Sequence, residues 1–209
     1  CPYVIPVVRP SLRNTHALAV DLLQCCYLIG VHITNNPAIP QRKSIRLPGY
    51  DYTLAGAYFI TLVTWQRECL FGEVVAGEMQ LTKLGSMVAS EWKRLEKRFP
   101  AVELDEWVVM PNHFHGIIVL TGNAQSDHKS PTREGFRSPV AGSISTILRS
   151  FKSSVTQWAK GAGLGTAIWH RNYYEHVIRD ELEYGKIRLY IQDNPRRWGD
   201  DEENPNRTG

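Results

Sequence analysis

The sequence predicts an α+β domain: a ferredoxin-like antiparallel sheet with helices packed on one face, plus a C-terminal helix. Two observations predict this class. Runs of strand length, rich in β-branched and aromatic residues, alternate with segments whose apolar residues recur at three- and four-residue steps. With 209 residues, 43% of them hydrophobic, the chain is long enough for one domain with a substantial core. Strands interleaved with two packing helices favour an antiparallel sandwich.

These patterns place the elements along the chain. In order, we expect a strand at 57–65, a short strand within 70–78, a helix at 82–99, strands at 102–109 and 113–120, a helix from about 144 to 158, a strand at 169–178 and a helix from about 180 to 193. Leu84, Val88 and Trp92 define the apolar face of the first helix, and Pro100 ends it. Asp180 is expected to cap the last helix at its N-terminus.

The remaining segments suggest how the chain is organised. We expect an N-terminal extension of unknown role at 1–40, the main domain at 41–198 and a flexible acidic tail at 199–209. Residues 122–142 are rich in Pro, Gly and Ser and are predicted to form a loop.

Composition excludes some classes of protein. The net charge of +3 is too small to indicate nucleic-acid binding, although basic residues exceed acidic ones between His128 and Arg171. The four cysteines show no zinc-binding spacing, which favours a reduced cytoplasmic protein. The most apolar stretch, residues 17–33, is interrupted by polar side chains and is too short to span a membrane.

The segment MPNHFHGIIVL, Met110–Leu120, is the most informative motif. Side chains two apart on a strand point to the same face, so His113 and His115 are expected to project together. Paired imidazoles on a rigid strand are suitable ligands for a divalent metal ion. The alternative is that both are strand-edge histidines without a chemical role.

A second motif, LYIQDNP, lies at the end of the last expected helix. Tyr190 and Asn194 are four residues apart and share a helical face, so the Asn194 carbonyl oxygen and the Tyr190 phenol can approach the same ion. The alternative is a half-buried aromatic and a helix cap. Other tyrosines compete for the role of nucleophile: Tyr50, Tyr52, Tyr58, Tyr173, Tyr174 and Tyr184. Tyr190 is preferred because it alone brings a metal-binding partner on its own helical face.

Six segments together resemble one protein family. They are RKSIRLPGYDY, AYFITLVTWQRECLFG, MPNHFHGIIVL, RSFKSSVTQWA, WHRNYYEHVIRDE and YIQDNP. The set resembles the REP-associated tyrosine transposases, bacterial relatives of the single-tyrosine insertion-sequence transposases with a His-hydrophobic-His (HUH) motif. The likeness extends over roughly residues 42–198.

The resemblance implies a function and a set of site residues. His113 and His115 would bind Mg²⁺ or Mn²⁺, with Asn194 as the third ligand. Tyr190 would attack a phosphate of single-stranded or hairpin DNA, leaving a 5′-phosphotyrosine link and a free 3′-hydroxyl, and a later attack would rejoin the strands. This is the chemistry of a DNA transposase that nicks and recombines strands. A cytoplasmic, nucleoid-associated location follows, and a homodimer is open because relatives in the wider group dimerise.

Basic residues provide candidate DNA contacts. Arg42, Lys43, Arg46, Arg149 and Lys152 are expected to hold backbone phosphates, which positions DNA without reading its sequence. The alternative for each is a solvated side chain that serves solubility.

Two other functions remain open from the sequence. One is a DNA-binding module or repressor that keeps the fold but has lost cleavage. The other is a phosphoesterase that uses its histidines directly. Gly116 and Ile117 follow the histidine pair, which argues against the further alternating histidines that histidine-triad hydrolases need.

Overall fold

The computed structural model describes residues 54–122 and 142–207, which belong to one compact unit. Several expectations lie outside these residues. They are the extension at 1–40, the boundary near residue 41, the basic residues Arg42, Lys43 and Arg46, Tyr50 and Tyr52, and nearly all of the loop at 122–142.

The predicted fold class is confirmed. The elements of the main sheet and its helices, in chain order, are β1 (Gly56–Val63), α2 (Lys83–Lys93), β4 (Val102–Val109), β5 (His113–Leu120), α4 (Ile144–Gly161), β6 (Tyr174–Ile178) and α5 (Glu181–Asp193). The four strands pair in the antiparallel order β4-β5-β1-β6. With α2 and α4 as the connecting helices, this is the ferredoxin-like βαββαβ arrangement, to which α5 is added.

Some elements differ from the expected ones. The chain around 70–81 forms a separate hairpin of β2 (Gly72–Val75) and β3 (Glu78–Leu81) rather than one short strand. Its two-residue turn has positive φ at Ala76 (52°) and Gly77 (78°), as tight hairpins need. The helix expected at 82–99 is divided at Arg94 into α2 and α3 (Leu95–Arg98). The last strand begins only at Tyr174.

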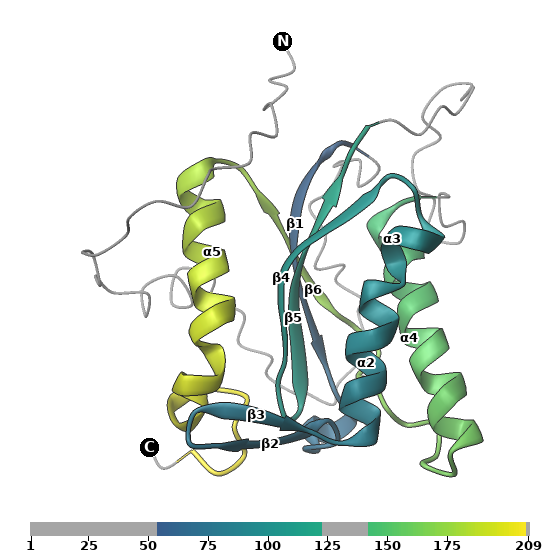
Figure 1. Ribbon diagram of the computed structural model, residues 1–209, viewed down its shortest axis with the longest axis vertical. Helices are drawn as coiled ribbons and strands as arrows, with labels where there is room; N and C mark the ends of the chain where they lie inside the picture. Colours follow the sequence, from purple (N-terminus) through teal and green to yellow (C-terminus); the bar gives the residue numbers. More distant parts are fainter. Residues whose placement is uncertain (1–53, 123–141, 208–209) are drawn as a thin grey trace, which may run out of the picture. The chain divides into compact units, whose positions relative to one another are not determined.

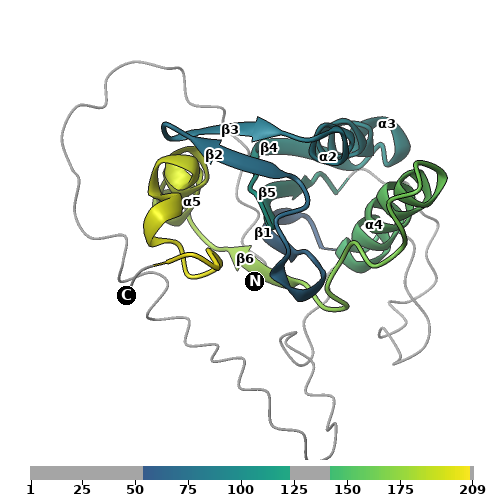
Figure 2. The same ribbon diagram turned by 90° about the horizontal axis from the view of Figure 1, so that it is seen from below.

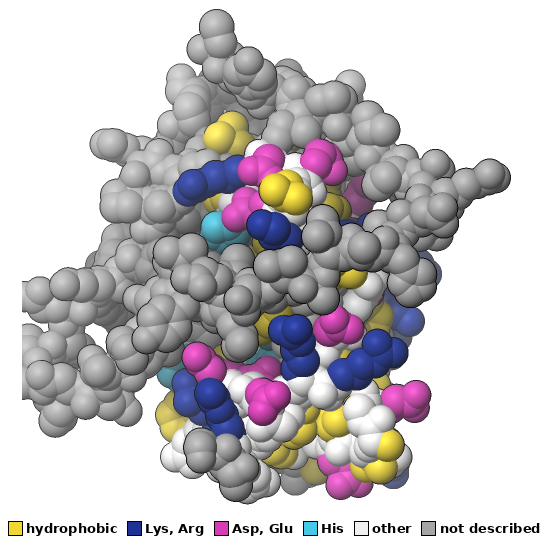
Figure 3. All heavy atoms as spheres, turned by 90° about the vertical axis from the view of Figure 1, so that its left-hand side faces the viewer, with side chains coloured by type: hydrophobic (Ala, Val, Ile, Leu, Met, Phe, Trp, Pro, Cys, Tyr) yellow, Lys and Arg dark blue, Asp and Glu magenta, His cyan; other side chains and the backbone are white. Residues whose placement is uncertain are grey.

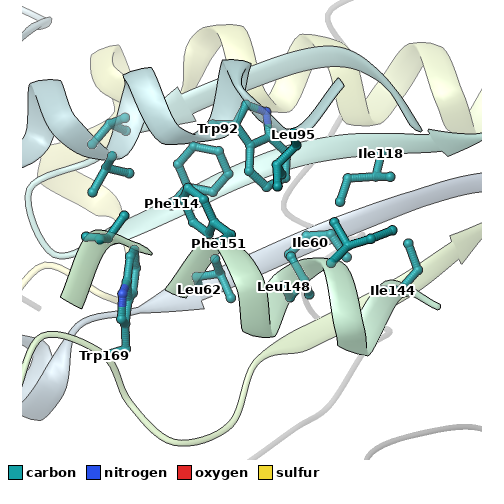
Figure 4. Packing of buried hydrophobic residues seen from close by; sticks show 14 of the residues in the cluster. Ile60, Leu62, Trp92, Leu95, Phe114, Ile118, Ile144, Leu148, Phe151 and Trp169 are labelled. Atoms are coloured by element: carbon teal, nitrogen blue, oxygen red, sulfur yellow. The ribbon is translucent and has the colours of Figure 1, made fainter. Parts of the chain in front are cut away.

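The helices lie on both faces of the sheet. Figures 1 and 2 show α2 and α4 on one face and α5 on the opposite face, while the β2–β3 hairpin crosses one end. The larger core, between the sheet and α2 and α4, includes Trp92, Phe114 and Phe151, all fully buried (Figure 4). The smaller core lies under α5 and consists of Ile117, Val119, Ile178, Ile187 and Ile191.

Strand β5 therefore has two different faces. Phe114 and Gly116 point to the larger core, whereas His113 and His115 point toward α5. A Cβ atom at Gly116 would lie 2.6 Å from Cζ2 of Trp92, so only glycine lets the indole pack directly against the strand. This packing fixes the strand that carries both histidines.

Helix α5 is attached to the neighbouring edge strand by polar contacts. Arg188 forms ion pairs with Asp105 (3.1 Å) and Glu106 (3.7 Å), and Gln192 donates to Glu106 (2.8 Å). At its N-terminus, the Asp180 carboxylate accepts from the Glu183 amide at 2.8 Å, which confirms the predicted cap. The helix that carries Tyr190 is thus anchored at its start and along its length.

The C-terminal segment differs from the flexible tail that its acidic composition predicts. The 3₁₀ helix η2 (Asn194–Asp200) follows α5 directly. Beyond it, Glu203 forms an ion pair with Arg67 (2.8 Å), and its carbonyl oxygen accepts from the Asn112 side chain (2.6 Å). Packing contacts therefore hold this segment against the domain up to at least Asn204, whose amide donates to the Trp198 carbonyl (2.8 Å).

Among the residues that the structure describes, no helix is both long and apolar enough to cross a lipid bilayer.

Candidate active site

The two histidines open strand β5 and lie side by side. His113 pairs with Val63 and His115 with Thr61 on β1, so both side chains emerge from the same face of the sheet. Their ring centroids are 4.6 Å apart. Both residues are buried, with exposed fractions of 0% and 5%. The strand geometry expected from the sequence is present.

Asn112 determines which nitrogen of His113 carries the proton. Its side-chain nitrogen donates to the carbonyl oxygens of Arg67 (3.1 Å) and Glu203 (2.6 Å). The Asn112 oxygen therefore faces the ring and accepts from Nδ1 of His113 at 2.9 Å. Since Nδ1 holds the proton, Nε2 presents a lone pair into the site.

This lone pair lacks a hydrogen-bond partner. Within the described part of the chain, neither Nε2 of His113 nor the side-chain oxygen of Asn194 has one, although both are buried. The Asn194 side chain lies beside the His113 ring and raises the pKa of His113, against the larger effect of burial. Two buried acceptor atoms without donors need an external partner, and a cation satisfies both.

Burial keeps both imidazoles neutral. Burial lowers the pKa of His113 from 6.5 to about 4, against the opposing effects of Asp201 and Asn194. Burial also lowers the pKa of His115 well below its ordinary value, and the adjacent His113 lowers it further. Neutral imidazoles at physiological pH are the form that binds metals.

His115 joins the histidine pair to Tyr190. Its Nδ1 lies 2.9 Å from the Thr61 hydroxyl, and its Nε2 lies 3.3 Å from the Tyr190 hydroxyl. In the tautomer with the proton on Nδ1, the ring donates to Thr61 and accepts the phenolic hydrogen of Tyr190. Phe59 stacks on the His115 ring at 5.3 Å and holds its plane.

The end of α5 brings Tyr190 and Asn194 to the histidines. Asn194 keeps helical geometry (φ −54°, ψ −45°) although the α-helix ends at Asp193, so the four-residue spacing still puts both side chains on one face. Tyr190 is partly exposed, whereas Asn194 is 2% exposed. One chain thus brings together the four residues that the sequence singled out.

The competing tyrosines have other surroundings. Tyr58 is fully buried, and its hydroxyl donates to the Leu54 carbonyl at 2.9 Å. Burial and the Asp105 carboxylate raise the pKa of Tyr184, which disfavours a phenolate there. Tyr173 packs against the larger core. Tyr174 on β6 pairs with Thr61 on β1, which in turn pairs with His115 on β5. Its side chain therefore lies on the same face of the sheet as His115, but two strands away.

The side chains at the site partly resemble those of a metal centre. Within 54–122 and 142–207, no group of three or more His, Cys, Asp or Glu is placed to hold an ion. The candidate set instead combines two imidazoles with an amide oxygen, and two of its atoms are buried acceptors without partners. These atoms fit a divalent cation.

The predicted DNA contacts differ in their surroundings. Arg149 is exposed and lines a groove of ≈ 560 Å³ with Lys160 and Arg171. Lys152 lines the same groove, but its amine donates to the carbonyl oxygens of His170 (2.7 Å) and Arg171 (3.3 Å). Burial lowers the pKa of Lys152 to about 8. This lysine is engaged in holding the backbone before β6, and the phosphate contacts stay predictions.

The outer side of α5 carries charges of both signs. Lys and Arg side chains lie next to Asp and Glu side chains on this face (Figure 3). The described side chains that are visible on this side therefore show a mixed charge rather than a single sign.

Several site residues were not foreseen from the sequence. Asn112 lies between two expected strands and has no predicted role, although an amide directly before the first histidine is a signal. Thr61 faces His115 because of the β1–β5 register, which one sequence does not reveal. Asp201 was assigned to a tail, yet its Oδ2 lies 3.9 Å from Nε2 of His113.

Comparisons with known proteins place the chain in a family. No protein-family model matches the sequence. An uncharacterised protein of Haemophilus influenzae is 42% identical over 171 residues, which are 80% of this chain and 95% of that protein. The chain belongs to the same family as this protein.

A second relative carries a functional name. A Haemophilus influenzae protein named "Putative REP-associated tyrosine transposase" is 24% identical over 149 residues, 71% of this chain and 75% of that protein. It confirms the resemblance that the motifs indicate, and it supports a transposase-type function. A solved structure of a REP-associated tyrosine transposase bound to a REP hairpin covers 71% of each chain with 25% identity and a TM-score of 0.47.

Proposed function

We propose that this protein is a transposase-type enzyme that cuts and rejoins single-stranded or hairpin DNA through Tyr190. One observation carries the proposal: the Tyr190 hydroxyl lies 3.3 Å from Nε2 of His115 in the same chain. Tyr190 is partly exposed, as a residue that meets a DNA strand must be. The substrate class is that implied by the resemblance.

The transfer step exchanges one phosphoester for another. The Tyr190 oxygen attacks the phosphorus, and the bond from phosphorus to the 3′-oxygen of the preceding nucleotide breaks. The products are a 5′-phosphotyrosine and a strand end whose 3′-oxygen has gained a proton, so the phenolic proton is balanced. Since a phosphoester is formed for each one broken, a 3′-hydroxyl can reverse the step without an external energy source.

His115 holds the Tyr190 hydroxyl beside the candidate metal ligands. Its Nε2 faces the hydroxyl, and its low pKa leaves this lone pair open to a divalent ion, which would favour the phenolate once bound. Thr61 and Phe59 hold the ring at this position. A phenol with an ordinary pKa of about 10 needs such help to react near neutral pH.

A divalent ion, Mg²⁺ or Mn²⁺, would be held by His113, His115 and Asn194. When bound, such an ion stabilises negative charge on the phosphate oxygens and favours the phenolate. Two features hold these ligands in position. Asn112 orients His113, and the helical geometry at Asn194 holds its side-chain amide beside the His113 ring.

The test is covalent capture of DNA. Wild-type protein is incubated with labelled single-stranded hairpin DNA and Mn²⁺, and a protein–DNA adduct is sought on a denaturing gel. We expect an adduct that is absent from Tyr190→Phe and retained in Tyr184→Phe, a matched variant on the same helix. Tyr174→Phe tests the other tyrosine on this face.

Other outcomes identify the alternatives. DNA binding without an adduct in the wild type would favour a module or repressor that has lost cleavage. Phosphodiester hydrolysis that survives Tyr190→Phe would favour a phosphoesterase that uses its histidines directly. An adduct that survives Tyr190→Phe but is lost in Tyr174→Phe would show that Tyr174 on β6 is the nucleophile.

A further inference from the structure

The loop after η2 places a carboxylate beside the candidate metal ligands. Asp201 is 11% exposed, and its Oδ2 lies 3.9 Å from Nε2 of His113. Its other oxygen, Oδ1, accepts from the Glu203 amide at 2.7 Å, so only Oδ2 is left to face the site. The Asp201 amide donates to the Trp198 carbonyl at 3.2 Å, which fixes the turn.

The distance itself has a physical meaning. A separation of 3.9 Å is too long for a hydrogen bond between these two atoms. Two donor atoms that each lie ~2.1 Å from one ion are about 3.0 Å apart at right angles and at most ~4.2 Å apart across it. The observed separation therefore falls within the span of two ligands of one cation.

The loop is held in this place by the same residue that orients His113. Asn112 accepts from the His113 ring and donates to the Glu203 carbonyl, two residues after Asp201. Arg67 reinforces the attachment through its ion pair with the Glu203 carboxylate at 2.8 Å. The position of Asp201 relative to Nε2 is thus built into the fold.

The chemistry of the ligand set provides a further reason. Two neutral imidazoles and an amide carry no charge, and imidazole ligands suit Zn²⁺ and other transition-metal ions. Mg²⁺ and Mn²⁺ prefer charged carboxylate oxygens. One carboxylate would provide the missing negative charge and favour the harder ions.

We propose that Asp201 is an additional, anionic ligand of the divalent ion that His113, His115 and Asn194 would bind. The two imidazoles and this carboxylate are not placed as a ready group of three ligands, so Oδ2 would approach the ion when it binds. The inference rests on the proposed function, because the ion is the one proposed there. It gives the C-terminal segment a chemical role and makes selectivity for Mn²⁺ over Zn²⁺ a property of that segment.

The experiment measures metal affinity on metal-free protein, independently of DNA cleavage. Mn²⁺ and Zn²⁺ binding are measured by calorimetry, and Mn²⁺ also by electron paramagnetic resonance, for wild type, Asp201→Asn and Glu202→Gln. Glu202 is exposed on the same loop, so its variant removes an equal charge without touching the site. We expect Asp201→Asn to weaken Mn²⁺ binding by about tenfold or more and Zn²⁺ binding much less.

The remaining outcomes separate the two proposals. Equal Mn²⁺ affinity in wild type and Asp201→Asn would overturn the role of Asp201 while leaving the metal site intact. Equal weakening of Mn²⁺ and Zn²⁺ would also overturn it, since a disturbed fold affects both ions alike. Absence of Mn²⁺ binding in the wild type would remove the metal site itself.

Discussion

The buried histidine pair should make the metal-free protein sensitive to acid. The pKa of His113 is lowered from 6.5 to about 4 by burial. Between these values the unfolded chain binds a proton that the folded protein does not, so protons favour unfolding. The contribution of this residue to stability is therefore present above about pH 6.5 and is lost as the pH falls toward 4.

The size of the effect follows from the shift. Each pKa unit corresponds to 1.36 kcal/mol, so a shift of about 2.5 units gives ~3 kcal/mol between about pH 7 and about pH 4. About two thirds of this contribution to the free energy of unfolding should be lost by about pH 5. His115, whose pKa is also lowered, acts in the same direction.

Urea unfolding with a chelator tests this effect. The free energy of unfolding of wild type and His113→Gln is measured from about pH 7 to about pH 4, with His170→Gln, an exposed histidine, as control. We expect the pH-dependent loss to be ~3 kcal/mol smaller in His113→Gln and unchanged in the control. The same pH dependence in all three proteins would refute the reasoning about a buried neutral imidazole.

Three further predictions follow from the site and the core. Mixtures of two inactive variants, His113→Ala and Tyr190→Phe, should form no DNA adduct, because one chain brings both side chains together; recovery of the adduct on mixing would indicate sites shared between subunits. Gly116→Ala should lower the free energy of unfolding by about 1–3 kcal/mol, since its Cβ would lie 2.6 Å from the facing indole, and chemical unfolding that matches the wild type would contradict this. Thr61→Val removes the hydroxyl 2.9 Å from Nδ1 of His115 and should slow adduct formation by about tenfold with the fold preserved, as circular dichroism would show; an unchanged rate would exclude a positioning role for this residue.

Local patterns predicted most of the elements. The strands at 102–109 and 113–120 have the expected bounds because both are short runs rich in β-branched and other apolar residues, and 113–120 is buried throughout. The hairpin at 72–81 was missed because its turn depends on backbone angles at Ala76 that residue type does not favour. The last strand was expected to begin at Trp169, but it begins at Tyr174. Trp169 makes only an isolated bridge to Thr64, and its large ring packs into the core instead.

The site was predictable where it depends on short-range spacing. His113 and His115 share a strand face, and Tyr190 and Asn194 share a helical face, so each pair could be recognised from the chain alone. The partners that orient these residues come from distant segments. The contact between Asn112 and Glu203 spans 91 residues, and no local period predicts it.

One polypeptide brings together both the imidazoles and the phenol, so the proposed activity would not require a neighbouring molecule. An inactive allele expressed beside an active one could not inactivate it by exchanging helices, and would interfere only by occupying the same DNA. Loss-of-function alleles of this protein should therefore behave as recessive in a cell that carries both.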